Sequence, residues 1–164
     1  MTLSRLDQWI EGAFLLAFSF LCLTSASCAL PRIIVLHDPL TPEEHINLGL
    51  AYEKKGETEQ AVEEYERAAK DLPTAYLYLG NIYYGKAEYA RAEQYYRKAI
   101  RNNPGLTDAY NNLSWLLYTC GRNLEEAEML ARKATELAPS NETYKDTLAR
   151  VEEKMKKEAA PAGK

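Results

Sequence analysis

Few side chains in this 164-residue chain have the types and spacings that catalysis needs. Its two histidines, His37 and His45, do not stand at a spacing typical of a metal site, and we expect His45 to pack between helices. Cys120 would need a positioned base to act as a nucleophile, and only these histidines could supply one. The glutamates of residues 63–66 are expected on a solvated helix face, and there is no glycine-rich phosphate loop. We therefore predict no enzymatic activity, metal or cofactor.

The charge pattern argues against nucleic-acid binding. The chain has a formal charge of −4, and its lysines and arginines are interspersed with glutamates. A nucleic-acid site needs a basic face, because contacts to phosphates supply much of the affinity. We therefore expect no nucleic-acid partner.

The first 30 residues differ in composition from the rest of the chain. After Glu11, no charged residue occurs until Arg32. The strongly apolar part, residues 12–23, has the length of a signal-peptide core and is short for a membrane span of about 20 residues. Three small residues stand directly before Cys28, as cleavage of a signal peptide requires. Residues 1–27 therefore predict export from the cytoplasm.

The stretch LTSASC, residues 23–28, resembles the lipobox of bacterial lipoproteins, whose cysteine is lipidated and becomes the first mature residue. It departs from the favoured pattern in having Ser25, not leucine, three residues before the cysteine. The resemblance implies lipidation of Cys28 and a membrane-anchored protein of the bacterial cell envelope, facing the periplasm or the exterior. Two alternatives stay open. One is a plain secretory signal cut near Cys28 or Ala29, and the other is an uncleaved anchor formed by the 20 uncharged residues after Glu11.

Three stretches of the chain repeat one pattern. Residues 48–68 read LGLAYEKKGETEQAVEEYERA and residues 79–99 read LGNIYYGKAEYARAEQYYRKA, with eight identical positions. A looser copy follows at 113–134. The first two copies are 31 residues apart, and the second and third are 34 residues apart. Self-similarity at such a period predicts stacked helical units, each too small to bury its apolar face alone.

The residues that recur at fixed offsets resemble the tetratricopeptide repeat, a 34-residue pair of antiparallel helices. The matching residues are His45, Leu48, Gly49, Tyr52, Ala61, Tyr65, Ala68 and Pro73 in the first copy, Tyr76, Leu79, Gly80, Tyr83, Ala92, Tyr96, Ala99 and Pro104 in the second, and Tyr110, Leu113, Ser114, Leu117, Ala127, Ala131, Ala134 and Pro139 in the third. The resemblance implies an all-α fold, a short right-handed α-solenoid of about three helix pairs. Because Ala87 stands where the family has a turn glycine, we expect some strain there.

Local signals set the limits of the array. Thr41, Pro42 and Glu44 have the spacing of a capping box with proline at N1, so the first helix should begin at Pro42. A final helix with a polar outer face is predicted from one apolar stripe: Tyr144, Leu148, Val151 and Met155. The predicted parts are a linker at 28–40, three units across 41–139 (about 42–72, 73–106 and 107–141), a capping helix at 140–157 and a disordered tail at 158–164.

In this family, the first helices of the pairs line a concave groove that binds an extended peptide or a partner helix. The resemblance maps these residues to the groove: Asn47, Leu50, Tyr78, Asn81, Tyr84, Asn111, Asn112, Trp115 and Tyr118. Asparagine can pair with a peptide bond whatever its side chain, and the aromatic residues supply contact area unless they pack between helices. The basic clamp that some members use for C-terminal carboxylates is absent, since its slots hold Ile46, Tyr78 and Asp108.

Two functions fit these features, and neither involves a small-molecule substrate. The first is a non-enzymatic adaptor that holds a protein or extended peptide in its groove, tethered to a membrane by its N-terminal lipid or anchor. The second is an accessory scaffold subunit that packs along its outer face in a larger assembly. The stretch at residues 37–56 faintly resembles a repeat segment appended to some bacterial cysteine peptidases. The peptidase core is missing from this sequence, so that activity would belong to a partner.

Overall fold

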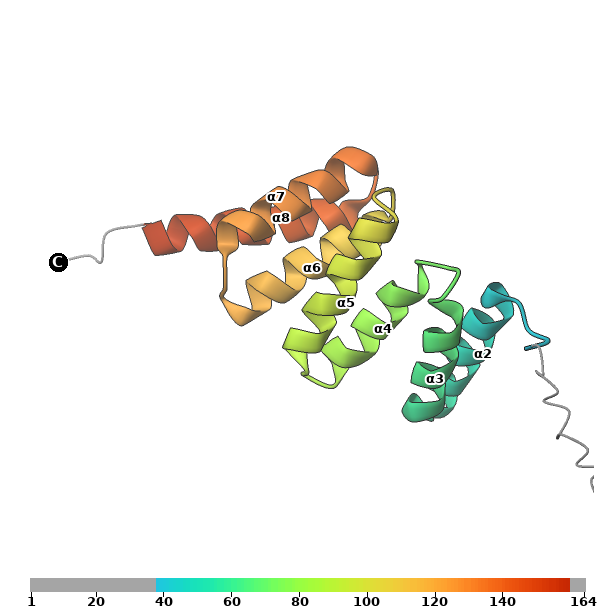
Figure 1. Ribbon diagram of the computed structural model, residues 1–164. Helices are drawn as coiled ribbons and strands as arrows, with labels where there is room; N and C mark the ends of the chain where they lie inside the picture. Colours follow the sequence, from blue (N-terminus) through green and yellow to red (C-terminus); the bar gives the residue numbers. More distant parts are fainter. Residues whose placement is uncertain (1–37, 160–164) are drawn as a thin grey trace, which may run out of the picture. The chain divides into compact units, whose positions relative to one another are not determined.

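The computed structural model describes residues 38–159, and every regular element in that range is an α-helix (Figure 1). The helices are α2 (Pro42–Lys55), α3 (Thr58–Ala68), α4 (Ala75–Gly85), α5 (Tyr89–Asn102), α6 (Thr107–Cys120), α7 (Leu124–Leu137) and α8 (Glu142–Ala159). The predicted signal segment and Cys28 lie outside the described residues. None of these helices is both long enough and apolar enough to cross a membrane.

Consecutive helices pair into three hairpins, α2 with α3, α4 with α5, and α6 with α7 (Figure 1). Each second helix also packs against the first helix of the next pair, and α8 packs against α6 and α7. The buried side chains form two clusters, one centred on α2 to α4 and one on α4 to α8. Tyr76 and Tyr95 contact both clusters, so the apolar core is continuous from the first hairpin to α8.

The start of α2 is fixed by its own first residues. Glu44 N donates to Thr41 Oγ1 over 3.2 Å, and Thr41 N donates to Glu44 Oε2 over 2.7 Å. These reciprocal bonds satisfy backbone N–H groups that have no partner within the helix, and Pro42 has no N–H to satisfy. The predicted capping box is confirmed.

The two helices of each pair meet closely at one small residue. A Cβ atom at Gly49 would overlap the ring of Tyr65, and a Cβ atom at Gly80 would overlap the ring of Tyr96. In the third pair the same slot holds Ser114, whose buried hydroxyl donates to the carbonyl of Ala127 over 2.6 Å. These residues are small because a second-helix group occupies the space that a larger side chain would fill.

The hairpin turns share one backbone conformation. Gly56, Ala87 and Gly121 have φ angles of 79°, 57° and 60°, all in the left-handed region. Glycine adopts this conformation freely, whereas a Cβ atom makes it costly by about 1–2 kcal/mol. The strain expected at Ala87 is confirmed by its φ angle.

Helix lengths explain the irregular repeat spacing. α3 ends at Ala68, whereas α5 continues three residues beyond the corresponding Ala99. The linker after α3 is two residues longer than the linker after α5, and α4 begins two residues closer to its repeat leucine than α6 does. Together these differences give the 31-residue interval between the first two copies. At the other end, α8 continues through Glu158 and Ala159, which the sequence assigned to the disordered tail. The helix continues there because its last turns consist largely of strong helix formers.

α8 occupies the place of a fourth first helix. Tyr144 and Val151 are buried, while the face away from the array is charged. The slot filled by glycine or serine in the three pairs holds Leu148 here. The polar outer face makes α8 an end to the array, because it needs no further cover.

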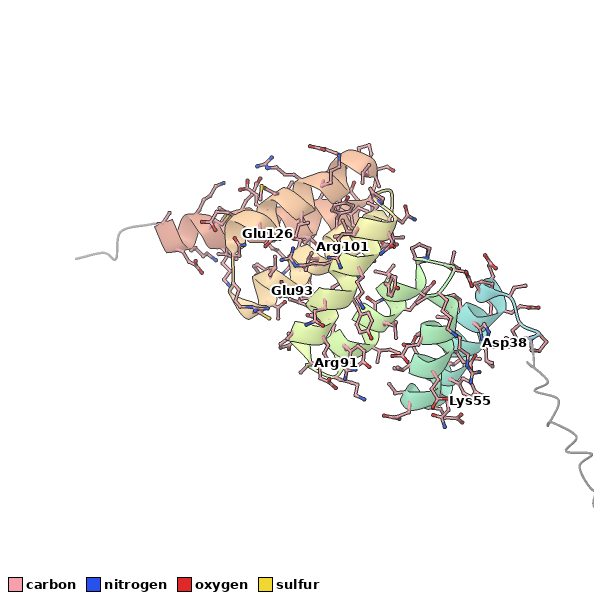
Figure 2. The ribbon with its side chains drawn as sticks, viewed as in Figure 1. Asp38, Lys55, Arg91, Glu93, Arg101 and Glu126 are labelled. Carbon is pink, nitrogen blue, oxygen red and sulfur yellow. The ribbon has the colours of Figure 1, made fainter. Side chains whose placement is uncertain are left out.

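An arginine joins α5 and α7, the second helices of the second and third pairs. Arg97 on α5 donates to Glu93 on the same helix and, through both guanidinium ends at 2.6 and 3.0 Å, to Glu126 on α7. Glu93 and Glu126 are labelled in Figure 2. Arg122 donates to the second oxygen of Glu93 over 2.9 Å. Hydrogen bonds from Arg97, the main cause, hold the pKa of Glu126 below its ordinary value. The network ties α5 to α7 with bidentate geometry.

Candidate functional site

A hollow of about 290 Å³ lies between residues of the first helices of the second and third pairs. Its lining consists of Asn81, Tyr84, Tyr96, Asn112 and Trp115. Four of these residues were mapped to the groove from the sequence, and the structure brings them together from α4 and α6. Asn81 is exposed, while the other three are half-buried and keep part of their surface accessible.

Hydrogen bonds fix the amide of Asn81. Tyr96 donates its hydroxyl proton to Asn81 Oδ1 over 3.0 Å, and Asn112 Nδ2 donates to the same oxygen over 2.9 Å. Burial, together with the nearby Tyr84, raises the pKa of Tyr96 above its ordinary value, so its hydroxyl keeps its proton and remains a donor. The Asn81 carbonyl therefore has two partners, and its Nδ2 has none among the described residues.

Aromatic side chains support one another along α6. The rings of Trp115 and Tyr118 lie 5.1 Å apart at an angle of 31°. Lys154 of α8 places its ammonium 5.0 Å from the centre of the Tyr118 ring and donates to the Tyr118 carbonyl over 2.9 Å. Tyr118 thus holds Trp115 and α8 in place and does not itself line the hollow.

The remaining predicted groove residues lie elsewhere. Asn47 and Leu50 are exposed on α2 and do not line the hollow. Tyr78 stacks on Tyr65 of α3, with ring centres 5.0 Å apart, so it packs between helices.

Asn111 differs from the sequence expectation because its side chain is buried, with 7% of its surface exposed. Ile46 and Leu77 occupy the corresponding slot in the first two pairs and are also buried. This slot faces the interior, so Asn111 does not present its amide to a groove ligand. Asn111 Oδ1 is a buried acceptor without a partner in the described structure.

Tyr96 is the lining residue that the sequence analysis missed, because it was named only among the recurring residues of the repeat pattern. The residue type itself could have indicated a polar contact at this position. A buried tyrosine needs a partner for its hydroxyl, whereas phenylalanine would serve for packing alone. Tyr65 in the same slot of the first pair likewise donates to Glu53.

A second polar cluster corrects the expectation for Glu64. Its side chain is buried, not solvated, with Oε2 lying 2.6 Å from His45 Nδ1 and Oε1 accepting from Arg67 over 2.9 Å. His45 Nε2 lies 3.2 Å from Asp38, which is labelled in Figure 2. His45 is therefore packed between helices, as expected. The cluster joins the segment before α2 to α3, and in the described range no three metal-ligating side chains form a metal site.

Two curated proteins are similar to parts of this chain. The protein O-mannosyl-transferase TMTC2 of Homo sapiens is 31% identical over 100 residues, which are 57% of this chain and 12% of that protein. The anaphase-promoting complex subunit 3 of Schizosaccharomyces pombe is 28% identical over 122 residues, which are 73% of this chain and 18% of that protein. The chain thus spans less than a fifth of the length of either relative.

A solved structure, the first tetratricopeptide-repeat domain of Spaghetti (RPAP3) bound to the HSP90 peptide SRMEEVD, has a similar fold. The TM-score is 0.65 at 21% identity, covering 74% of this chain and 98% of that one. The family model described as tetratricopeptide repeat matches residues 46–107 and 79–142, which together exceed half of the chain. The predicted all-α solenoid is thereby confirmed, and the chain belongs to the tetratricopeptide-repeat family.

Proposed function

We propose that the chain is a non-enzymatic adaptor that binds an extended segment of a protein partner through the hollow between α4 and α6. The observation that carries this proposal is the convergence of Asn81, Asn112, Tyr84 and Trp115 on one accessible hollow. Amide groups can pair with the backbone of any peptide, and aromatic faces supply the apolar contact that most often dominates an interface. The fold supports a role in protein interaction.

The test is a peptide array probed with the full-length chain in mild detergent. The array carries random twelve-residue peptides, acetylated and amidated so that no terminal charge contributes. Three proteins are compared: the wild type, Trp115→Ala in the hollow, and Met129→Ala, a control on α7 whose side chain is 64% exposed. Far-UV circular dichroism checks that all three fold.

We expect a set of peptides that bind the wild type and the Met129→Ala variant and lose at least tenfold in affinity with Trp115→Ala. If no peptide binds, or if Trp115→Ala leaves the affinity of the bound peptides unchanged, the hollow is not the binding site.

We further propose that the N-terminal segment tethers this adaptor to the bacterial cell envelope through Cys28. The support is the sequence pattern of residues 23–28 described above. Intact-mass spectrometry of the protein recovered from a bacterial membrane fraction tests it. A lipidated Cys28 adds the mass of its acyl chains to a chain that starts at that residue, and Cys28→Ser abolishes the addition. A mass matching plain cleavage or the uncleaved chain would select one of the two alternatives instead.

The scaffold role remains a second candidate, favoured by exposed apolar side chains on α7. Met129 and Leu137 on α7 are 64% and 42% exposed. If α7 is the contact face, Met129→Asp together with Leu137→Asp should abolish co-purification with an assembly while peptide binding stays unchanged.

A further inference from the structure

The hollow between α4 and α6 offers more hydrogen-bond donors than acceptors. Asn81 Oδ1 already accepts from Tyr96 and from Asn112. Asn112 Oδ1 accepts from the adjacent Asn111 Nδ2 over 3.4 Å. Both N–H groups of Asn81 Nδ2 have no partner among the described residues, and Asn112 Nδ2 keeps one N–H beyond the one it gives to Asn81. The indole N–H of Trp115 also lacks a partner within residues 38–159. A ligand in this hollow must therefore supply mainly acceptors.

The lining contains no ionised side chain, since it consists of asparagine, tyrosine and tryptophan. The acceptors that suit it are therefore neutral carbonyl oxygens, because a buried carboxylate without a cationic partner would lose its hydration without compensation. Tyr84 and Trp115 add flat aromatic surfaces on the two facing helices. The ligand chemistry that matches is a carbonyl-rich, N–H-poor backbone that carries compact apolar rings.

We propose that the hollow binds a proline-rich segment in the polyproline II conformation. This inference rests on the proposed groove-binding function and specifies its ligand. Proline keeps its carbonyl acceptor and has no backbone N–H, so it adds no donor that would stay unpaired against a donor-rich lining. Polyproline II backbones are preformed and leave their carbonyls solvated, and aromatic-lined grooves are a recurring way to recognise them.

A polyproline II helix repeats every three residues at about 3.1 Å per residue, so prolines three residues apart lie on one face about 9 Å apart. Tyr84 on α4 and Trp115 on α6 both line the hollow. One face of such a ligand can therefore contact both aromatic side chains.

Asn81→Asp tests the donor requirement with almost no change of shape. The carboxylate still accepts from Tyr96 and Asn112, but the N–H groups offered to the ligand are replaced by an oxygen. Asn47→Asp is the matched control, because it adds the same charge to the exposed side of α2 without touching the hollow. Thermal unfolding checks that both variants are as stable as the wild type to within a few degrees.

The measurement is isothermal titration calorimetry of the full-length chain in mild detergent. The probes are an acetylated, amidated peptide of ten prolines and a glycine–serine peptide of the same length and the same end groups. We expect the proline peptide to bind at least tenfold more tightly than the glycine–serine peptide. Asn81→Asp should weaken its binding at least tenfold, and Asn47→Asp less than twofold.

Equal affinity for the two peptides, no binding of the proline peptide, or equal losses in the two variants would overturn the inference. The peptide array separates this failure from that of the adaptor function. Array peptides that lack proline but depend on Trp115 would leave the adaptor standing and reject the proline-rich ligand. An array without binders would reject both.

Discussion

Gly80 on α4 and Tyr96 on α5 share one space, because the tyrosine ring lies where a Cβ atom of residue 80 would be. The same ring carries the hydroxyl that orients Asn81. The contact that joins the two helices of the second pair therefore also sets the donor pattern of the hollow. Packing and binding chemistry depend here on one side chain.

Gly80→Ala should destabilise the protein by about 1–3 kcal/mol, since the added methyl group overpacks the contact with Tyr96. Gly85→Ala is the matched control on the same helix. A Cβ atom there has no neighbour within 4 Å, so alanine should be neutral or stabilising by up to about 1 kcal/mol. Urea unfolding followed by circular dichroism measures both. Equal effects of the two substitutions would show that helix propensity, not the ring, governs residue 80.

Ala87→Gly should stabilise the protein by about 0.5–1 kcal/mol. It relieves the left-handed strain at φ 57°, and part of the gain is offset by the greater freedom of glycine in the unfolded chain. Gly56→Ala, in the same turn of the first pair, should destabilise by a similar amount. The unfolding midpoint in urea reports both changes, and a lower midpoint for Ala87→Gly would contradict the strain assigned to this turn.

Asn111→Leu should stabilise the protein by about 1–3 kcal/mol, because it removes a buried acceptor without a partner from an apolar slot. The equivalent residues Ile46 and Leu77 show that the slot accepts large aliphatic side chains. The melting temperature should rise, and peptide affinity should change less than twofold, because Asn111 reaches the hollow only through its long 3.4 Å hydrogen bond to Asn112 Oδ1. Loss of peptide binding in a stable variant would show that Asn111 contributes to the groove.

Acid should weaken the link between α5 and α7 through Glu126. Its pKa is lowered in the folded protein, mainly by hydrogen bonds from Arg97, so its contribution is complete above its ordinary value of 4.5 and is lost as the pH falls through the lower folded value. Glu126→Gln removes this term, which should be worth up to about 1 kcal/mol at neutral pH. The wild type should exceed the variant in stability at pH 7, and the difference should vanish towards pH 3. A difference independent of pH would show that the charge of Glu126 is not what matters.

The repeat register alone predicted most of the residues that line the hollow. Equivalent positions of α4 and α6 carry Asn81 and Trp115, and a fixed offset from a recognised motif is enough to put them on one side of the array. The register did not distinguish a slot that faces the groove from one that faces the interior, so Asn111 was misplaced. A groove slot and an interior slot can be neighbours in the sequence, as Asn111 and Asn112 are.

Hydrogen bonds between residues far apart in the sequence could not be predicted, for a different reason. Glu64 looks like any helix-surface glutamate, and only the fold brings His45 against it from 19 residues away. The hydroxyl of Tyr96 meets Asn81 in the same way, across a hairpin. Periodicity reveals which face of a helix is apolar. It does not reveal which polar groups on two different helices will contact each other.

Leu148 has a consequence for how this array could be lengthened in the laboratory. The three pairs close over glycine or serine at this slot, and α8 presents leucine, which leaves no room for the tyrosine of a following second helix. Extra hairpins should therefore be accepted when spliced in ahead of α8 and rejected when appended behind it. α8 therefore terminates the array, and additional hairpins can be inserted at the junction between α7 and α8.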